Sequence, residues 1–237
     1  MISFGPLRAH PRRLYAGSAE WNESVGQNGE NLAAALVHAP GLLQRLNKVL
    51  PIFGFHYEIS VSPVGNDRFG SEFRVLLRDL RTNTETLLGD TGFGVSQAIP
   101  ILAQGILSAL SGEQVPWVRL VGVEQPEIHL HPRLQAQMAD FFSWTAGVDK
   151  ANPFPRRKGM ALGVQWVIET HSEALILRLQ RRIREGRLRP EDVSVLFVSP
   201  SGEGSRIFEL RMNAAGEFID EWPGGFFAER IDEILGD

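Results

Sequence analysis

The stretch VRLVGVEQPEIHLHPRLQ, residues 118–135, decides the fold class. It begins as an apolar run and ends abruptly in Glu124, Gln125, Pro126 and Glu127, followed by two histidines. The run is typical of a buried strand, and acids at the C-terminal edge of a parallel sheet face the crevice where such sheets bind ligands. A carboxylate in that position commonly holds Mg²⁺ against phosphate oxygens. The stretch therefore predicts a nucleotide site at a sheet edge.

The residues after this stretch predict alternating helices and strands. Pro132 opens a helix with apolar residues on one side, and strand 164–169 leads into helix 172–186 and then into strand 193–199. Strand, helix, strand, helix, strand implies a parallel sheet with right-handed crossovers. The predicted fold class is therefore α/β, with a mostly parallel sheet flanked by helices. If the strands that end at Glu124 and Glu169 are neighbours, five residues converge at one edge: Glu124, Gln125, Thr170, His171 and Ser172.

The residues before the stretch predict a different local structure. The first 30 or so residues lack periodicity and indicate an irregular segment. Residues 31–50 predict two short helices separated by Pro40, and the alternating segments 56–63 and 71–79 predict a hairpin. The Gly-rich segment GDTGFGVSQ, residues 89–97, then leads into a helix expected from about Gln97 to Ser111, where Pro100 is tolerable only near the first turn. The predicted division is 1–90 (irregular, helical and hairpin), 91–200 (α/β lobe) and 201–237 (small C-terminal domain).

Composition limits the function classes without choosing one. The chain has 237 residues, 43% of them hydrophobic, which is ample for a sizeable core. No apolar run approaches the roughly 20 residues of a membrane-spanning helix, and no signal-peptide pattern follows the N-terminal arginines. The absence of cysteine excludes disulfides and thiolate metal sites and is compatible with the cytoplasm. A net charge of −4 gives no global attraction to nucleic acid.

Four motifs in order carry a resemblance to a known family. GFGVSQ (92–97), VGVEQ (121–125), EIHLHP (127–132) and THS (170–172) are similar to the C-terminal half of the ABC-type ATPase heads of the RecF, SMC and OLD-nuclease superfamily. The opening FGPLR (4–8) and the closing EWPGGFFAERIDEIL (221–235) resemble bacterial AAA-family ATPases that end in a small uncharacterised C-terminal domain. The resemblance covers essentially the whole chain and implies a partial P-loop-type fold.

The resemblance also implies roles for particular residues. GFGVSQ corresponds to the signature motif, so Gly92, Gly94, Ser96 and Gln97 would reach a nucleotide bound by the opposite subunit. VGVEQ corresponds to Walker B, in which Glu124 would hold Mg²⁺, and THS to the switch loop, in which His171 would sense phosphate. The implied cofactors are ATP and Mg²⁺. The implied partner is a second copy or a chain that carries the phosphate loop, Walker A.

Two departures from the family pattern affect the predicted activity. No G-x-x-x-x-G-K-[S/T] occurs, and none of the lysines (Lys48, Lys150, Lys158) lies in a Gly-rich strand-to-helix turn. We therefore expect the C-terminal half of a longer or split ATPase, inactive alone. The second departure is Gln125, since an amide can orient the attacking water but cannot accept its proton. Glu127 is the alternative candidate for the base.

Each motif also has a structural interpretation. GFGVSQ forms an ordinary tight turn equally well, capped by Ser96, and the pair His129 and His131 lacks the third ligand of a metal site. The arginine-rich helix 172–186 is expected to bury Leu175, Leu179 and Ile183 and to expose most of its arginines, of which Arg178, Arg181 and Arg182 are candidates for nucleic-acid contact. The alternative function is a regulatory or binding module that keeps the ATPase fold without catalysis.

Overall fold

The computed structural model describes residues 2–16, 24–39, 41–65, 72–110, 119–151, 163–202, 204–223 and 225. Two short 3₁₀ turns, Leu88–Asp90 and Pro190–Asp192, accompany the longer elements. Those elements, in chain order, are β1 (Ile2–Phe4), β2 (Tyr15–Ala16), α1 (Leu32–His38), α2 (Leu42–Ile52), β3 (Tyr57–Val64), β4 (Glu72–Asp79), β5 (Glu85–Leu87), α3 (Phe93–Leu110), β6 (Arg119–Glu124), α4 (Pro132–Thr145), β7 (Val164–Glu169), α5 (Glu173–Arg184), β8 (Leu196–Ser201) and β9 (Gly204–Glu209).

A parallel sheet lies at the centre of the predicted α/β region. Its strand order is β1–β6–β7, and Glu124 lies in register with Glu169. The prediction that the two strands ending in these acids are neighbours is confirmed. The third expected strand forms as β8, but its predicted place in the parallel sheet is wrong, because it pairs antiparallel with β9 in a separate two-stranded sheet. Pro200 in β8 has no N–H to donate, and the tight return at Gly204, with φ of +135°, brings β9 back beside it. The third parallel strand is β1, which comes from the segment expected to be irregular.

The two faces of this sheet differ in what covers them. Alternation along β7 places Val164, Trp166 and Ile168 on one face, where Trp166 contacts Phe141 and Phe142 of α4. The opposite face has Gln165, Val167 and Glu169 exposed, and Glu124 belongs to this face through its register with Glu169. Parallel sheets are usually covered on both faces. Among the described residues, the face that carries Glu124 is largely uncovered.

Helix α3 begins earlier than the sequence predicts. It spans Phe93–Leu110, so most of GFGVSQ forms its first turn and Pro100 lies inside the helix rather than near its start. The predicted start at Gln97 is therefore wrong. The helix is apolar around most of its circumference, as expected of a helix that neighbouring elements surround. Tertiary burial offsets the hydrogen bond that Pro100 removes.

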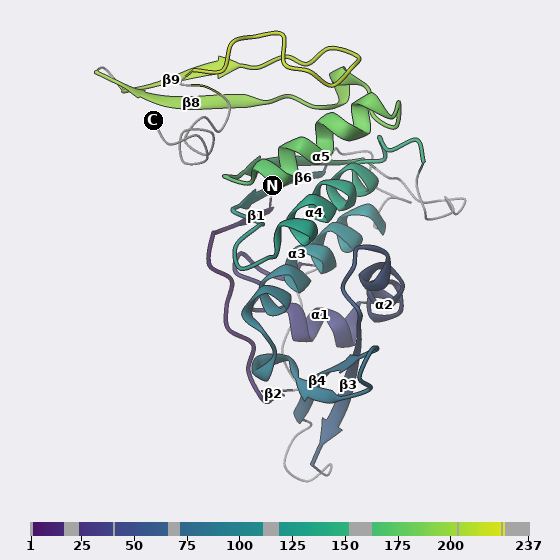
Figure 1. Cartoon of the computed structure of the whole chain (residues 1–237). Helices are drawn as coiled ribbons and strands as arrows, with labels where there is room; N and C mark the ends of the chain where they lie inside the picture. Colours follow the sequence, from purple (N-terminus) through teal and green to yellow (C-terminus); the bar gives the residue numbers. More distant parts are fainter. Residues whose placement is uncertain are drawn as a thin grey trace, which may run out of the picture.

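The predicted helical pair and hairpin are confirmed. Helices α1 and α2 flank Pro40, which lies outside the described residues, and β3 pairs antiparallel with β4 from Tyr57–Asp79 to Val64–Glu72. Strands β2 and β5 also pair with β4. Figure 1 shows this sheet at one end of the molecule, with α3, α4 and α5 stacked in the middle.

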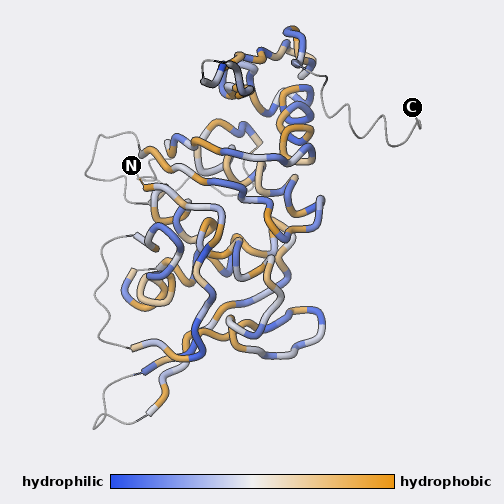
Figure 2. Tube along the Cα trace, turned by 90° about the vertical axis from the view of Figure 1, so that its left-hand side faces the viewer, coloured by the Kyte–Doolittle hydropathy of each residue, from blue (hydrophilic) through white to orange (hydrophobic). Residues whose placement is uncertain are grey.

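The β8–β9 hairpin lies at the opposite end (Figure 1). Leu196, Val198 and Ile207 are exposed on it, and the hydropathy colouring in Figure 2 shows hydrophobic stretches at this end outside the main body. The predicted boundary at residue 200 falls inside β8, and the division into three parts stays a prediction. Residues 147–163, whose prolines and run of basic residues predict a mobile loop, and the closing segment 221–235 lie largely outside the described residues. No helix in the described part of the chain is long and apolar enough to cross a bilayer.

Candidate functional site

The carboxyl ends of β6 and β7 bring two acids and a histidine together. Glu124 and Glu169 end neighbouring parallel strands in register, and both are exposed. His171 Nε2 lies 3.3 Å from Glu169 Oε1, and 79% of the His171 side chain is exposed. No hydrogen bond or ion pair among the described residues involves the Glu124 carboxylate, so it is available to an incoming cation. Glu169 was absent from the predicted site, although its place at the end of the second strand signalled it.

Gln125 has an unusual backbone conformation for a residue with a side chain. Its φ is +45°, in the left-handed region that non-glycine residues seldom adopt, and His129 nearby has φ of +60°. The Gln125 N–H donates to the carbonyl oxygen of Glu169 at 2.8 Å, which extends the β6–β7 ladder by one residue. Strain of this kind persists only where the surroundings hold it. Contacts from other segments of the chain must therefore hold the turn after Glu124 in this conformation.

Glu127 is a buried acid that joins the turn after β6 to the segment after β7. Its Oε2 accepts from Thr170 Oγ1 at 2.8 Å, and its Oε1 accepts from the His171 N–H at 2.7 Å. Ser172 then caps α5 by accepting from the Leu175 N–H. Because both carboxylate oxygens of Glu127 are engaged, its geometry favours a positioning role over that of a base. Thr170, His171 and Ser172 do converge on the β6 end as the sequence predicts.

Arg8 is a second site residue, after Glu169, that the sequence prediction missed. It is 4% exposed, and its guanidinium donates to the Glu124 carbonyl at 2.7 Å and to the Gln125 carbonyl at 3.2 Å. Burial lowers the pKa of Arg8 to about 10, although the nearby charges of Glu127 and Glu124 act to raise it. Arg8 therefore stays charged at neutral pH. Its only sequence signal is its position in FGPLR, a segment named solely for its family resemblance.

The signature residues divide into accessible and internal ones. Gly92 is exposed and Gly94 is half-buried, whereas Ser96 and Gln97 are buried. The Ser96 hydroxyl donates to the Phe93 carbonyl, and among the described residues the Gln97 side chain bonds only the Arg8 backbone. Gln97 is thus not available to a nucleotide in this structure, which differs from its predicted role. The first turn of α3 reaches solvent through Gly92, Phe93 and Gly94.

Gly94 is close-packed against the turn that follows β6. A Cβ at Gly94 would overlap the His129 carbonyl oxygen, while a Cβ at Gly92 would meet nothing within 4 Å. We expect Gly94→Ala to lower the free energy of unfolding by about 1–3 kcal/mol, the usual effect of overpacking. Gly92→Ala is the matched control and should change it by less than about 1 kcal/mol. Urea unfolding measures both, and equal effects of the two substitutions would contradict the close packing.

The paired histidines are structural in this arrangement. His129 packs edge-to-face on Phe93 with ring centroids 4.8 Å apart, and His131 Nδ1 caps α4 by accepting from the Arg133 N–H at 3.3 Å. Within the described ranges, no group of three or more His, Cys, Asp or Glu is arranged to hold a metal. A Mg²⁺ ion at Glu124 would therefore take its remaining ligands from water or phosphate, as magnesium commonly does.

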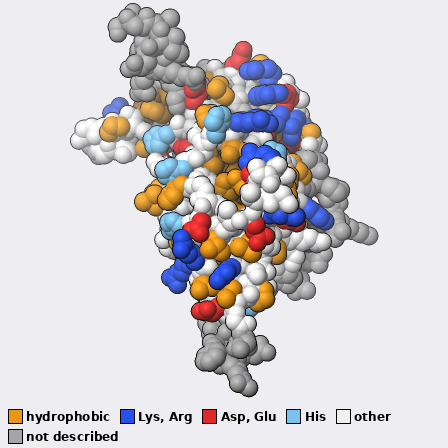
Figure 3. Space-filling view, turned by 60° about the horizontal axis from the view of Figure 1, so that its bottom comes forward, with side chains coloured by type: hydrophobic (Ala, Val, Ile, Leu, Met, Phe, Trp, Pro, Cys, Tyr) orange, Lys and Arg blue, Asp and Glu red, His pale blue; other side chains and the backbone are white. Residues whose placement is uncertain are grey.

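The predicted exposed cationic face on α5 is wrong for two of its three arginines. Arg178 and Arg182 both bind Asp140 of α4, and their side chains are only 19% and 11% exposed. Arg181 is 61% exposed and pairs with Glu185. On the face drawn in Figure 3, acidic and hydrophobic side chains are interspersed among the Lys and Arg. Arg178 and Arg182 thus attach α5 to α4.

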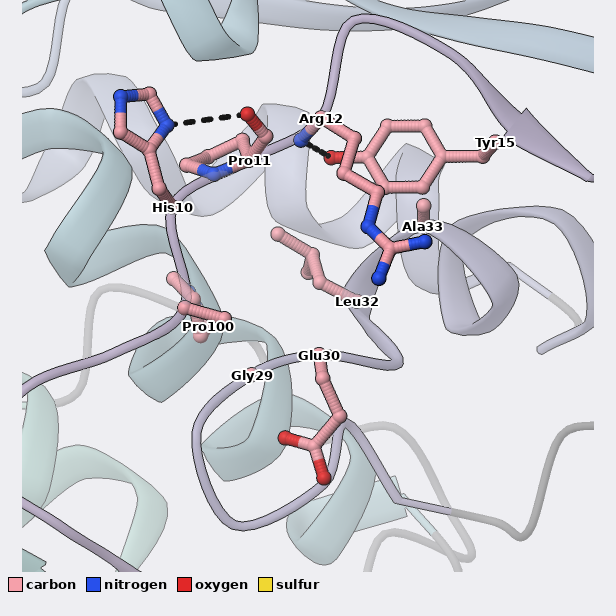
Figure 4. Close-up of a pocket in the computed structure, with 10 residues that line it drawn as sticks. His10, Pro11, Arg12, Tyr15, Gly29, Glu30, Leu32, Ala33 and Pro100 are labelled. Atoms are coloured by element: carbon pink, nitrogen blue, oxygen red, sulfur yellow. Dashed lines mark hydrogen bonds between the residues drawn. The ribbon is translucent and has the colours of Figure 1, made fainter.

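A small pocket lies apart from the edge of the parallel sheet. Neither Glu124, Glu169 nor His171 lines it. Its lining comes from the segment after β1, from the start of α1 and from Pro100 of α3 (Figure 4). Within it the Arg12 N–H donates to the Tyr15 hydroxyl at 2.8 Å, and His10 Nδ1 lies 3.1 Å from the Pro11 carbonyl. Both contacts join residues within the segment 10–15 itself.

In this α/β fold the parallel strands β6 and β7 end in Glu124 and Glu169, beside the glycine-led start of α3. The chain belongs to the AAA ATPase domain family, whose model matches residues 19–176. No curated protein sequence matches the chain.

A solved structure of an SMC ATPase shares the fold, and a second SMC structure is similar. One, from work on ATP-driven dimerization and DNA-stimulated activation of SMC ATPases, is 10% identical with a TM-score of 0.50, and the match covers 86% of this chain and 96% of that one. An Smc head domain of Pyrococcus furiosus with an extended coiled coil, bound to the C-terminal domain of ScpA, is 10% identical with a TM-score of 0.48, and the match covers 87% of this chain and 40% of that one. At this identity the likeness shows the fold alone, a P-loop-type α/β head.

Proposed function

We propose that the chain is a lobe of an ABC-type ATPase head that acts on ATP together with a phosphate loop from another segment or chain. The observation that carries this proposal is the meeting of Glu124, Gln125 and His171 at one exposed edge of a parallel sheet. Ligands of such sheets bind outside the carboxyl ends of the strands. The uncovered sheet face beside Glu124 supports the second half of the proposal, because a further layer would bury it.

The donor chemistry of this edge fits a magnesium–nucleotide complex in part. Glu124 offers an exposed carboxylate, the kind of ligand Mg²⁺ prefers, and a bound magnesium ion would neutralise charge on the phosphates. The backbone nest and lysine that hold a triphosphate are not encoded in this sequence. The residues of this edge can therefore contact the magnesium ion and the terminal phosphate, but they do not supply the groups that hold the rest of the triphosphate.

Each residue of the edge has a distinct part in the proposal. Glu124 binds the magnesium ion, Gln125 orients the attacking water, and His171 contacts the terminal phosphate. Glu127 keeps the His171 backbone in place through its hydrogen bond to that N–H. Because an amide cannot accept the proton of the water, hydrolysis by this arrangement is slow.

The signature turn supplies the dimer contact. Gly92 and Gly94 lie at the solvent-facing start of α3, where backbone N–H groups and the positive end of the helix dipole attract phosphate. In a head-to-head dimer this turn would contact the nucleotide of the opposite subunit. A nucleic-acid role has little support on α5, since Arg181 is the predominantly exposed cation of the three candidates and it is ion-paired.

The isolated chain tests the need for a phosphate loop. We expect the purified protein to show no magnesium-dependent ATP turnover, because a carboxylate, a histidine and a signature turn do not hold a triphosphate. Release of phosphate measured with a coupled assay checks this, with Glu124→Ala as the control for contaminating ATPases. Turnover that Glu124→Ala abolishes would contradict the proposal that a second component is required.

A non-catalytic regulatory or binding module is the second candidate. The observation in its favour is the engagement of both Glu127 oxygens together with an amide at position 125, which leaves the turn without a free base. Supplying a phosphate-loop lobe in trans distinguishes the two. ATP binding that depends on Glu124 supports the ATPase lobe, whereas no binding supports the module.

A further inference from the structure

Arg8 occupies a position between three segments that are far apart in the sequence. It follows β1, its guanidinium lies on the carbonyls that end β6, and its backbone lies against α3. The side chain is almost wholly buried, and its Nε has no hydrogen-bond partner among the described residues. Burying a charged group in this way is unfavourable unless its remaining contacts are strong.

The guanidinium fixes the peptide groups of Glu124 and Gln125. Nη2 donates to the Glu124 carbonyl at 2.7 Å, and Nη1 donates to the Gln125 and Pro6 carbonyls at 3.2 Å each. These are charge-assisted hydrogen bonds, which are stronger than neutral ones. They hold the two carbonyls on either side of the residue whose φ is +45°. Arg8 thus supplies the external restraint that this strained turn needs.

The backbone of Arg8 makes a reciprocal pair with the side chain of Gln97. The Arg8 N–H donates to Gln97 Oε1 at 2.9 Å, and Gln97 Nε2 donates to the Arg8 carbonyl at 3.3 Å. Gln97 is 1% exposed and lies on α3, about one turn after Gly94. A shift of the start of α3 would therefore move Arg8, and Arg8 would move the turn after β6.

We propose that Arg8 is a positioning residue that joins the signature turn of α3 to the Glu124–Gln125 peptide. It holds Gln125 in its strained conformation and transmits displacement of α3 to the residues that face the nucleotide. The effect of this role on catalysis rests on the proposed function. The mechanical link itself is a property of the chain without nucleotide.

Native-state hydrogen exchange of the full chain, followed by NMR without nucleotide, tests the link. The reporter is the Gln125 amide, which donates to the Glu169 carbonyl, and interior amides of α4 report global opening. In Arg8→Met we expect the Gln125 amide to exchange about 10- to 100-fold faster than in the parent, relative to the α4 amides, as lost bonds to a charged donor imply. Arg8→Lys keeps the charge but not the fork and should recover part of the protection.

Arg182→Met is the matched control, because Arg182 on α5 is also a largely buried arginine. Its partner is the carboxylate of Asp140 and not a carbonyl at the site. It should lower global stability without a selective change at Gln125. Gln97→Ala leaves the Arg8 side chain intact and should still raise Gln125 exchange selectively, by at least about threefold, because it removes both buried hydrogen bonds to the Arg8 backbone. This variant decides the matter if Arg8→Met does not fold.

Unchanged relative exchange at Gln125 in a folded Arg8→Met variant, or in Gln97→Ala, would overturn the proposal. The same holds if Arg182→Met accelerates the Gln125 amide as selectively as Arg8→Met does. None of these measurements uses ATP, so failure of nucleotide binding in an assembled head would count against the proposed function and leave the exchange result intact.

Discussion

Gln125→Glu should raise the rate of ATP hydrolysis by about 100- to 10,000-fold in a head that contains a phosphate loop, the range expected for a general base. The amide of Gln125 can orient water, and a carboxylate at the same place can also remove its proton. Arg8 and the Glu169 carbonyl hold the backbone of residue 125 independently of its side chain, so the substitution should keep the turn. ATP binding should not tighten, since the new charge lies near the γ-phosphate.

Single-turnover hydrolysis and nucleotide binding, measured on a head assembled with a phosphate-loop lobe, check this result. Glu127→Gln is the comparison variant, because Glu127 is the alternative base. With both its oxygens engaged by Thr170 and His171, we expect Glu127→Gln to disturb the switch segment and to lower the rate only in part. If Gln125→Glu leaves the rate unchanged while Glu127→Gln abolishes it, Glu127 is the base and our assignment of Gln125 is wrong.

Phe141→Ala should lower the free energy of unfolding by about 3–5 kcal/mol, the usual loss for a fully buried aromatic residue. Phe141 on α4 is 0% exposed and contacts Phe53, Trp144 and Trp166, so one ring joins α4 to the end of α2 and to β7. Gly105 of α3 is also part of this contact, since a Cβ there would meet Phe141 Cζ at 2.6 Å. The cavity would open beneath the covered face of the sheet.

Chemical denaturation followed by tryptophan fluorescence measures this loss. Leu177→Ala on α5 is the control, because that side chain is 45% exposed and its truncation should lower the free energy of unfolding by less than about 1 kcal/mol. A loss at Phe141 no larger than at Leu177 would show that the sheet and helices do not depend on this contact.

Local patterns in the sequence predicted much of the scaffold. The apolar run that ends in Glu124, the alternating segments before and after residues 66–71 and the apolar periodicity of helices 132–145 and 173–184 all gave correct element types. These elements are specified by residues close together in the chain, through strand alternation, helical periodicity and caps such as Ser172. The pairing of β6 with β7 followed from the rule that strands joined by a helix are parallel neighbours.

The errors arose where a contact with a distant segment outweighed a local preference. Gly92, Gly94 and Pro100 indicate a late helix start, yet burial of an almost wholly apolar helix keeps α3 continuous from Phe93. Three residues, Ile2–Phe4, are too short to predict as a strand, and they become one by pairing with β6. The cations of α5 were expected to face solvent because the sequence does not show that Asp140 lies opposite Arg178 and Arg182.

The sequence by itself determined the chemistry at the strand ends: Glu124, Gln125 and His171 follow apolar runs, and strand termini can be recognised from neighbouring residues. Only the tertiary structure decided which groups are free and which are engaged. It leaves Glu124 exposed, occupies both oxygens of Glu127, and uses Gln97 to hold Arg8. The physical reason is that hydrogen-bond satisfaction of buried groups depends on partners up to 117 positions away, as Arg8 and Gln125 are, and no local pattern encodes such a pair.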